Sequence, residues 1–163
     1  MNIVKYPNKI LQERIPEFDF NNTEFDPISL EKEMLGLMLR NNGIGLAANQ
    51  VGLKVRMFVM GDAENPQQAQ AFYNPMVVEH LDQIIELEEG CLSFPGVYVK
   101  VKRPTKILAR WQNSKGEWQQ GELSGYDCVC FLHELDHLEG IIFKDRVSSL
   151  KWALAVKKSK KRK

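Results

Sequence analysis

The sequence contains no run of eighteen apolar residues, and its first seven residues lack the apolar core of a signal peptide. These two absences give no indication of a membrane span or of secretion. Cysteine is also scarce, because the chain has three, an odd number without the spacing of a disulfide framework. Such cysteine usage is typical of a reducing compartment, so we expect a cytoplasmic protein.

The chain shows no internal repeat and no linker-like stretch, so its 163 residues predict a single domain over 1–156 and a basic tail over 157–163. Six of the 22 basic residues and none of the 21 acidic residues lie in this tail, which leaves a net charge of −5 on the rest of the chain. A tail of this kind is either a solvated chain end or a segment that contacts nucleic acid.

Hydrophobic spacing and turn residues predict an α+β fold. Helices are expected from Asp26-Pro27 to a closing Gly43, at about 125–138, and from Ser148 into the tail. Strands are expected at 54–60, 71–79, 83–88, 97–101, 105–112 and 117–123. The expected architecture has mostly antiparallel strands packed around the second helix, with an N-terminal and a C-terminal helix beside them. Cys128 and Cys130 are expected to be packing residues and not a disulfide.

Two of the three histidines lie four residues apart, in the run His133-Glu134-Leu135-Asp136-His137. On a helix, positions i and i+4 share a face, so both imidazoles can reach one metal ion. Glu134 can then reach a water molecule at that ion, which is typical of a metal-activated hydrolase. The same spacing also occurs by chance in helices that bind no metal.

A catalytic site of this kind needs a third protein ligand and one open position. No histidine follows His137, and the acids Glu139 and Asp145 lie too close behind it to return to the metal from another helix. Cys91, between an expected strand and a Pro-Gly turn, is the remaining candidate and would complete a Cys-His-His set. The alternative is that Cys91 is a small buried apolar residue.

Residues 89–93, Glu-Gly-Cys-Leu-Ser, and the histidine run resemble two motifs of the peptide deformylases. Residues 43–50, Gly-Ile-Gly-Leu-Ala-Ala-Asn-Gln, resemble the third motif of that family. The three stretches follow the family's order and spacing, and the resemblance covers nearly the whole chain, closest to the plastid-type branch. Leu132 departs from the pattern, because the family usually has glutamine before the first metal-binding histidine.

The resemblance implies hydrolysis of the N-formyl group from the initiator methionine of new polypeptides, with release of formate. Glu134 would take a proton from the attacking water and pass it to the departing amine. The side-chain amide of Gln50 and the backbone N–H of Leu92 would donate hydrogen bonds to the oxyanion. Gln50 has a second interpretation as a loop cap, and Asp136 is expected to support a histidine ligand or the helix.

The resemblance also implies that the segment around Gly45 pairs with the extended peptide as a neighbouring strand does. Gly43 and Gly45 would allow close approach of the substrate backbone, or would form the turn that ends the first helix. The methionine side chain is expected in a pocket lined by Ile44, Leu87, Val129 and Cys130, with Tyr98 nearby. Ordinary core packing is the alternative role for each of these residues.

Ligand softness favours Zn²⁺ for a Cys-His-His set. The resemblance instead implies Fe²⁺ in the cell, replaceable by Zn²⁺, Ni²⁺ or Co²⁺. The expected partners are N-formylmethionyl peptides of nascent chains, and ribosomal RNA through the basic tail. The location would be the cytoplasm, or an organelle or host compartment that uses formylated initiator methionine.

Two rival functions remain open from the residues alone. A zinc peptidase that cuts internal bonds would take a histidine or glutamate as third ligand and would be indifferent to Cys91→Ala. A metalloprotein without enzymatic activity would be indifferent to Glu134→Ala.

Overall fold

The computed structural model describes residues 1–21, 24–61 and 68–161. Within them, the helices are α1 (Pro27–Arg40), α2 (Gly125–Leu138) and α3 (Ser149–Lys160), and the short 3-10 helices are η1 (Lys9–Gln12), η2 (Ala48–Val51) and η4 (Phe143–Arg146). The strands are β1 (Gly45–Ala47), β2 (Met57–Met60), β3 (Gln70–His80), β4 (Ile84–Gly90), β5 (Tyr98–Pro104), β6 (Lys106–Gln112) and β7 (Trp118–Ser124). The prediction of an α+β fold is confirmed.

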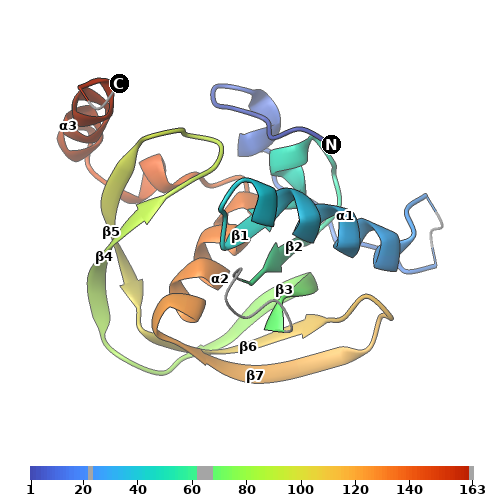
Figure 1. The fold of residues 1–163 in the computed structure, drawn as a ribbon. Helices are drawn as coiled ribbons and strands as arrows, with labels where there is room; N and C mark the ends of the chain where they lie inside the picture. The colour runs from blue at the N-terminus through green and yellow to red at the C-terminus, as the bar shows by residue number, and fades with distance from the viewer. Residues whose placement is uncertain (22–23, 62–67, 162–163) are drawn as a thin grey trace.

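The strands form two antiparallel sheets that lie on different sides of α2. Five strands pair in the order β1-β2-β3-β6-β7, and β4 pairs with β5 as a separate hairpin. Figure 1 shows α2 at the centre of the molecule, with α1 near β1 and β2, and α3 at the periphery near β5. The metal motif is therefore carried on the most enclosed helix of the described chain.

Helix α2 has the bounds that the sequence predicts, 125–138. Its residues from Cys128 to Glu134 are all buried, because the five-stranded sheet, the β4–β5 hairpin and the N-terminal segment surround it. Cys128 and Cys130 are free thiols in the core between α2 and the large sheet, so the expectation of packing residues is confirmed. Leu132 is 8% exposed and fills a position in this same core.

Helix α1 begins as predicted, because the side chain of Asp26 caps the N–H of Ser29 at 2.9 Å and Pro27 is the first helical residue. The prediction that Gly43 closes this helix is wrong. The helix ends at Arg40, and Asn42 takes the left-handed backbone conformation with φ of 53°. Asparagine tolerates that conformation better than most residues, so Asn42 and not Gly43 takes the left-handed position. Gly43 follows it, with its N–H donating to the carbonyl oxygen of Met38 at 3.0 Å.

β1 is a strand where none was expected. β2 begins at Met57 instead of 54, β5 continues to Pro104 instead of ending at 101, and the other strand ends lie within two residues of the expected ones. In β5 the buried residues alternate as Val99, Val101 and Arg103, so a charged side chain occupies a core-facing position. Among the described residues, no helix has both the length and the apolar character needed to cross a membrane.

Candidate metal centre

Cys91, His133 and His137 come together in the structure, although Cys91 is far from the histidines in sequence. One ligand atom of each residue lies within 4.8 Å of the others, and the Cys91 sulfur is 3.3 Å from Nε2 of His137. Cys91 directly follows β4 and is partly exposed, whereas both histidines are buried one turn apart on α2. One sulfur and two imidazole nitrogens suit a single borderline-soft metal ion with an open position.

The two imidazoles present the same nitrogen to the centre of the site. Nδ1 of His133 donates to Glu89 at 2.8 Å, which leaves Nε2 of His133 free for a metal. Burial, together with the charges of His133 and Arg103, holds the pKa of His137 well below its usual value. Burial by itself lowers the pKa of His133, but its contacts with Cys91 and Glu89 outweigh burial and raise the pKa. A neutral His137 is ready to bind a metal without losing a proton.

A buried network of charges lies behind His133. Arg103 donates to both oxygens of Glu89, at 2.8 and 3.1 Å, and to Asp136 at 2.6 Å. Burial by itself raises the pKa of Glu89, but hydrogen bonds from His133 and Arg103 lower the pKa to about 2. Asp136 also accepts two hydrogen bonds from Arg146, so it joins α2 to η4 and is linked to His133 through Arg103 and Glu89.

The sequence analysis assigned no role to Glu89 or Arg103. A usable signal is present, because Arg103 continues the alternation of Val99 and Val101 on one face of β5. A charged residue on the core-facing side of a strand requires a buried partner of opposite charge. Glu89 is that partner, on the adjacent strand β4.

Glu134 points its carboxylate into a buried position beside the ligand cluster. The residue is 4% exposed, and Oε2 has no hydrogen-bond partner among the described residues. Burial raises the pKa of Glu134 to about 7. A carboxyl group with this pKa can both accept and release a proton near neutral pH, as a general acid–base catalyst requires.

The two expected oxyanion donors are both neighbours of Cys91, Gln50 by contact with its sulfur and Leu92 as the next residue in the chain. The Gln50 amide donates to the Cys91 sulfur at 3.4 Å and to Oγ of Ser93 at 3.2 Å, while its Oε1 accepts from the N–H of Ala47 at 2.8 Å. Gln50 therefore caps the start of η2 and also faces the ligand cluster. The N–H of Leu92 has no protein acceptor among the described residues.

A cavity of about 460 Å³ opens over this cluster. Of the predicted site residues, those that line it are Ile44, Gly45, Gln50, Cys91, Leu92, Tyr98, Val129, Cys130, His133 and Glu134. Leu87, one strand position further from the ligands on β4, is not among the lining residues. β1 is an edge strand of the large sheet in the described chain, so no strand pairs with its outer side, and Ile44 and Gly45 at its start line the cavity.

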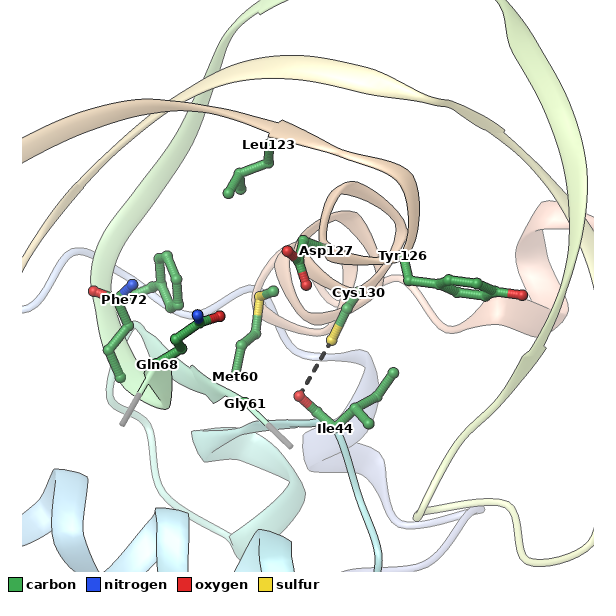
Figure 2. Close-up of a pocket in the computed structure, with 10 residues that line it drawn as sticks. Ile44, Met60, Gly61, Gln68, Phe72, Leu123, Tyr126, Asp127 and Cys130 are labelled. Carbon is green, nitrogen blue, oxygen red and sulfur yellow. Dashed lines mark hydrogen bonds between the residues drawn. The ribbon is translucent and has the colours of Figure 1, made fainter. Parts of the chain in front are cut away.

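A second cavity, of about 680 Å³, adjoins the first. Ile44, Tyr126 and Cys130 line both, and Figure 2 shows the Cys130 sulfur directed at the carbonyl oxygen of Ile44, at 3.5 Å. Cys91, His133 and His137 do not line the larger cavity, whereas Cys91 and His133 line the smaller one. Tyr126, which is 74% exposed in the first turn of α2, is a cleft residue that the sequence analysis did not predict.

Comparison with known proteins assigns this arrangement to a family. The family model described as polypeptide deformylase matches residues 1–153. The peptide deformylase of Thermotoga petrophila is 42% identical over 139 residues, which are 83% of this chain and 82% of that protein.

Solved structures agree with the sequence comparison. A peptide deformylase from Legionella pneumophila has a TM-score of 0.89 and 29% identity, over 99% of this chain and 94% of that one. Peptide deformylase 1B of Arabidopsis thaliana has a TM-score of 0.88 and 33% identity, over 99% of this chain and 90% of that one. The chain belongs to the peptide deformylase family.

Proposed function

We propose that this chain performs the reaction of its family, the metal-dependent removal of the formyl group from an N-terminal methionine, with the residues assembled here. Cys91, His133 and His137 are the proposed ligands of one divalent ion, and Glu134 is the proposed acid–base catalyst. The observation that carries the proposal is the buried Glu134 carboxylate, with a pKa of about 7, beside the three ligand residues. A bound divalent ion supplies Lewis-acid activation of water at neutral pH.

Proton transfer is the task of Glu134. Its ionised carboxylate takes a proton from the attacking water and returns it to the departing amine. In the metal-free protein, burial disfavours the ionised form and raises the pKa of Glu134 to about 7. Formate and the free amino terminus of the peptide are the two products.

Stabilisation of the oxyanion is the task of Gln50 and Leu92. The Gln50 side chain is fixed at both ends, because Oε1 accepts from Ala47 and Nε2 donates to Cys91 and Ser93. Nε2 carries two hydrogens, so donation to the oxyanion replaces the longer of its two contacts, the one at 3.4 Å to the Cys91 sulfur. The contacts with Ala47 and Ser93 keep the amide group oriented while this exchange takes place. The N–H of Leu92 lies next to the same sulfur ligand in the chain and supplies the second donor.

Peptide recognition uses the open side of β1. An extended peptide adds to such an edge through backbone hydrogen bonds, and its side chains then alternate between the cavity and solvent. The residues proposed to contact the methionine side chain are Ile44, Val129 and Cys130, and Tyr98 lines the same cavity. Leu87 stays a weaker prediction, because it does not line the cavity.

The proposed cellular metal is Fe²⁺, with Zn²⁺, Ni²⁺ or Co²⁺ as substitutes. A ligand set of one thiolate and two neutral imidazoles accepts any of these ions, and availability decides between them in a cell. Anaerobic purification followed by metal analysis tests this assignment. Iron at one equivalent per chain supports it, and zinc alone at full activity contradicts it.

Formate release is the direct test of the reaction. Anaerobically prepared protein should release formate from formyl-Met-Ala-Ser and leave acetyl-Met-Ala-Ser intact. Glu134→Ala should retain metal and lose activity by roughly 100- to 10,000-fold, whereas Cys91→Ala should lose metal as well. Glu122→Ala, which alters an exposed carboxylate on β7, serves as the matched control. Full turnover by Glu134→Ala, or cleavage of internal peptide bonds, would contradict the proposal.

The basic tail is proposed to bring the enzyme to ribosomal RNA. Lys157, Lys158 and Lys160 are exposed in the last turn of α3, at the periphery in Figure 1, and residues 162–163 lie outside the described residues. If all six cations of the tail meet phosphates, log K against log salt should slope by about −4 to −5. Replacement of the described tail lysines by glutamine should flatten this slope. Equal ribosome binding by the full chain and a chain truncated after Val156 would contradict the contact.

A cytoplasmic location, or an organelle or host compartment with formylated initiator methionine, stays a prediction. The matching relatives include bacterial proteins and plant proteins named as chloroplastic. Fluorescence microscopy of the tagged full chain in its own cells decides between these compartments.

A further inference from the structure

The N-terminal segment 4–6 bridges the two loops that carry the proposed oxyanion donors. The N–H of Val4 donates to the carbonyl oxygen of Gln50 at 2.7 Å. Two residues later, the N–H of Tyr6 donates to the carbonyl oxygen of Ser93 at 3.1 Å. Gln50 and Ser93 are therefore joined twice, once through their side chains at 3.2 Å and once through this segment.

Lys5, between these two contacts, reaches the second loop with its side chain. Its ammonium group donates to the carbonyl oxygen of Leu92 at 2.6 Å, and Lys5 also lines the 460 Å³ cavity. A hydrogen bond from a charged donor is shorter and stronger than one between neutral groups. The contact therefore restrains Leu92, whose N–H is the proposed oxyanion donor.

Aromatic packing holds the segment in place from the outer side. The ring of Tyr6 stacks on Phe94, with 4.9 Å between ring centroids, and Lys144 lies 5.5 Å from the centre of the Tyr6 ring. Phe94 in turn packs edge-on against Phe143 of η4, at 5.1 Å. These contacts fix Tyr6, the residue after Lys5. The position of the Lys5 side chain therefore does not depend only on its own hydrogen bond to Leu92.

We propose that Lys5 is a positioning residue for the deformylase reaction. By holding the carbonyl oxygen of Leu92, Lys5 restrains the backbone on the C-terminal side of this residue, and so the direction in which the Leu92 N–H points at the developing oxyanion. This inference rests on the proposed function, in which the N–H of Leu92 donates a hydrogen bond to the oxyanion. Lys5 acts through Leu92 and does not need to touch the peptide. Removal of Lys5 should therefore lower kcat more than it raises KM.

The test compares three variants with the wild-type chain on formyl-Met-Ala-Ser. Lys5→Met removes the ammonium and keeps an unbranched apolar side chain, Lys5→Arg keeps the charge and a donor, and Lys9→Met removes a nearby exposed charge in η1. Metal content and thermal unfolding are measured for each, so that rates refer to folded, metal-loaded protein. Amide hydrogen exchange at Leu92 and Ser93, followed by NMR, reports the loop directly.

The expected loss for Lys5→Met is roughly 5- to 20-fold in kcat, smaller than the loss on removing an oxyanion donor itself. KM should change less than about twofold, metal content should be unchanged, and exchange at Leu92 should accelerate. Lys5→Arg should recover most of the rate, and Lys9→Met should behave as wild type.

Three outcomes would overturn the inference while wild-type formate release still supports the proposed function. One is an unchanged kcat in Lys5→Met. Another is a rise in KM alone, which would indicate direct contact with the peptide. The third is an equal loss in Lys9→Met, which would indicate a general effect of charge. Absence of formate release by the wild-type chain would instead contradict the proposed function.

Discussion

Gly45 of β1 lies directly against the carboxylate of Glu134 on α2. A Cβ atom on Gly45 would come within 2.5 Å of Oε1 of Glu134 and 2.7 Å of the Cys130 sulfur. Any larger residue at position 45 would force β1 and α2 apart or turn the carboxylate away. Glycine at this position thus allows the edge strand to approach the catalytic helix, whatever its contact with substrate.

Gly45→Ala should therefore displace Glu134 and lower kcat by about 100-fold, as expected when a catalytic group moves by about 1 Å. Metal content should stay the same, because the three atoms nearest to the added methyl group belong to Glu134 and Cys130 and not to a proposed ligand. Steady-state kinetics with metal analysis measures both. The matched control is Gly36→Ala in α1, where alanine favours the helix and the nearest atom belongs to the flexible Arg40 side chain. Wild-type kinetics in Gly45→Ala would contradict this account of Glu134.

Glu89→Gln should weaken metal binding by roughly 10- to 100-fold, because Glu89 orients His133 through Nδ1. The substitution keeps the size of the side chain and removes the charge that both His133 and Arg103 need. Chelator competition measures the metal dissociation constant. Glu86→Gln, on the same strand and paired with Lys151 at the surface, should leave that constant unchanged. An equal effect of the two substitutions would argue against an orienting role of Glu89.

Arg103→Met should destabilise the fold by about 3–5 kcal/mol, because it leaves Glu89 and Asp136 buried without their shared partner. Arg146→Met should cost much less, since its side chain is 42% exposed and water replaces its contact with Asp136. Urea unfolding of the metal-free proteins compares the two. A loss below about 1 kcal/mol for Arg103→Met would mean that the network contributes little to stability.

Glu134→Gln should stabilise the metal-free protein at alkaline pH. Burial raises the pKa of Glu134 from 4.5 in the unfolded chain to about 7 in the folded one, so the folded state favours the protonated carboxyl group. Wild-type stability is accordingly full below pH 4.5 and falls as pH rises through 7, by about 3 kcal/mol. Glutamine does not ionise and escapes this loss. Unfolding free energies at pH 4.5 and 8 test the sign, and a variant that is less stable than wild type at pH 8 would contradict it.

Local sequence signals predicted the longer elements well and the shortest one poorly. The helix over 125–138 was recoverable because its apolar residues and Gly140 mark both its face and its end. β1 was not, because three residues show no alternation and the strand exists only through pairing with β2. The end of α1 was misplaced because Asn42 competes with Gly43 for the left-handed position.

In the candidate site, too, local sequence patterns predict some residues, whereas others come together only through long-range contacts. The spacing of His133 and His137 is a local signal, whereas Cys91 was placed by elimination and by resemblance to a family. Arg103 carries a local signal in the alternation of β5, but the identity of its partner does not. In the register of β4 and β5, Glu89 lies opposite Val99 and Arg103 lies opposite Ile85, so these two side chains meet only in the folded hairpin. Tyr126 was missed because its place at the cleft, where it lines the cavity together with the sequence-distant Ile44, has no local pattern in the sequence.

X-ray absorption of the zinc-loaded protein tests the central claim most directly. One Cys91 sulfur and two histidine nitrogens should give one scatterer at about 2.3 Å and two at about 2.0–2.1 Å from the metal. The sulfur signal should vanish in Cys91→Ala and persist in Cys128→Ala, whose thiol lies in the core away from the ligand cluster. A wild-type spectrum with only nitrogen and oxygen neighbours would contradict the assignment of Cys91, His133 and His137 as one metal site.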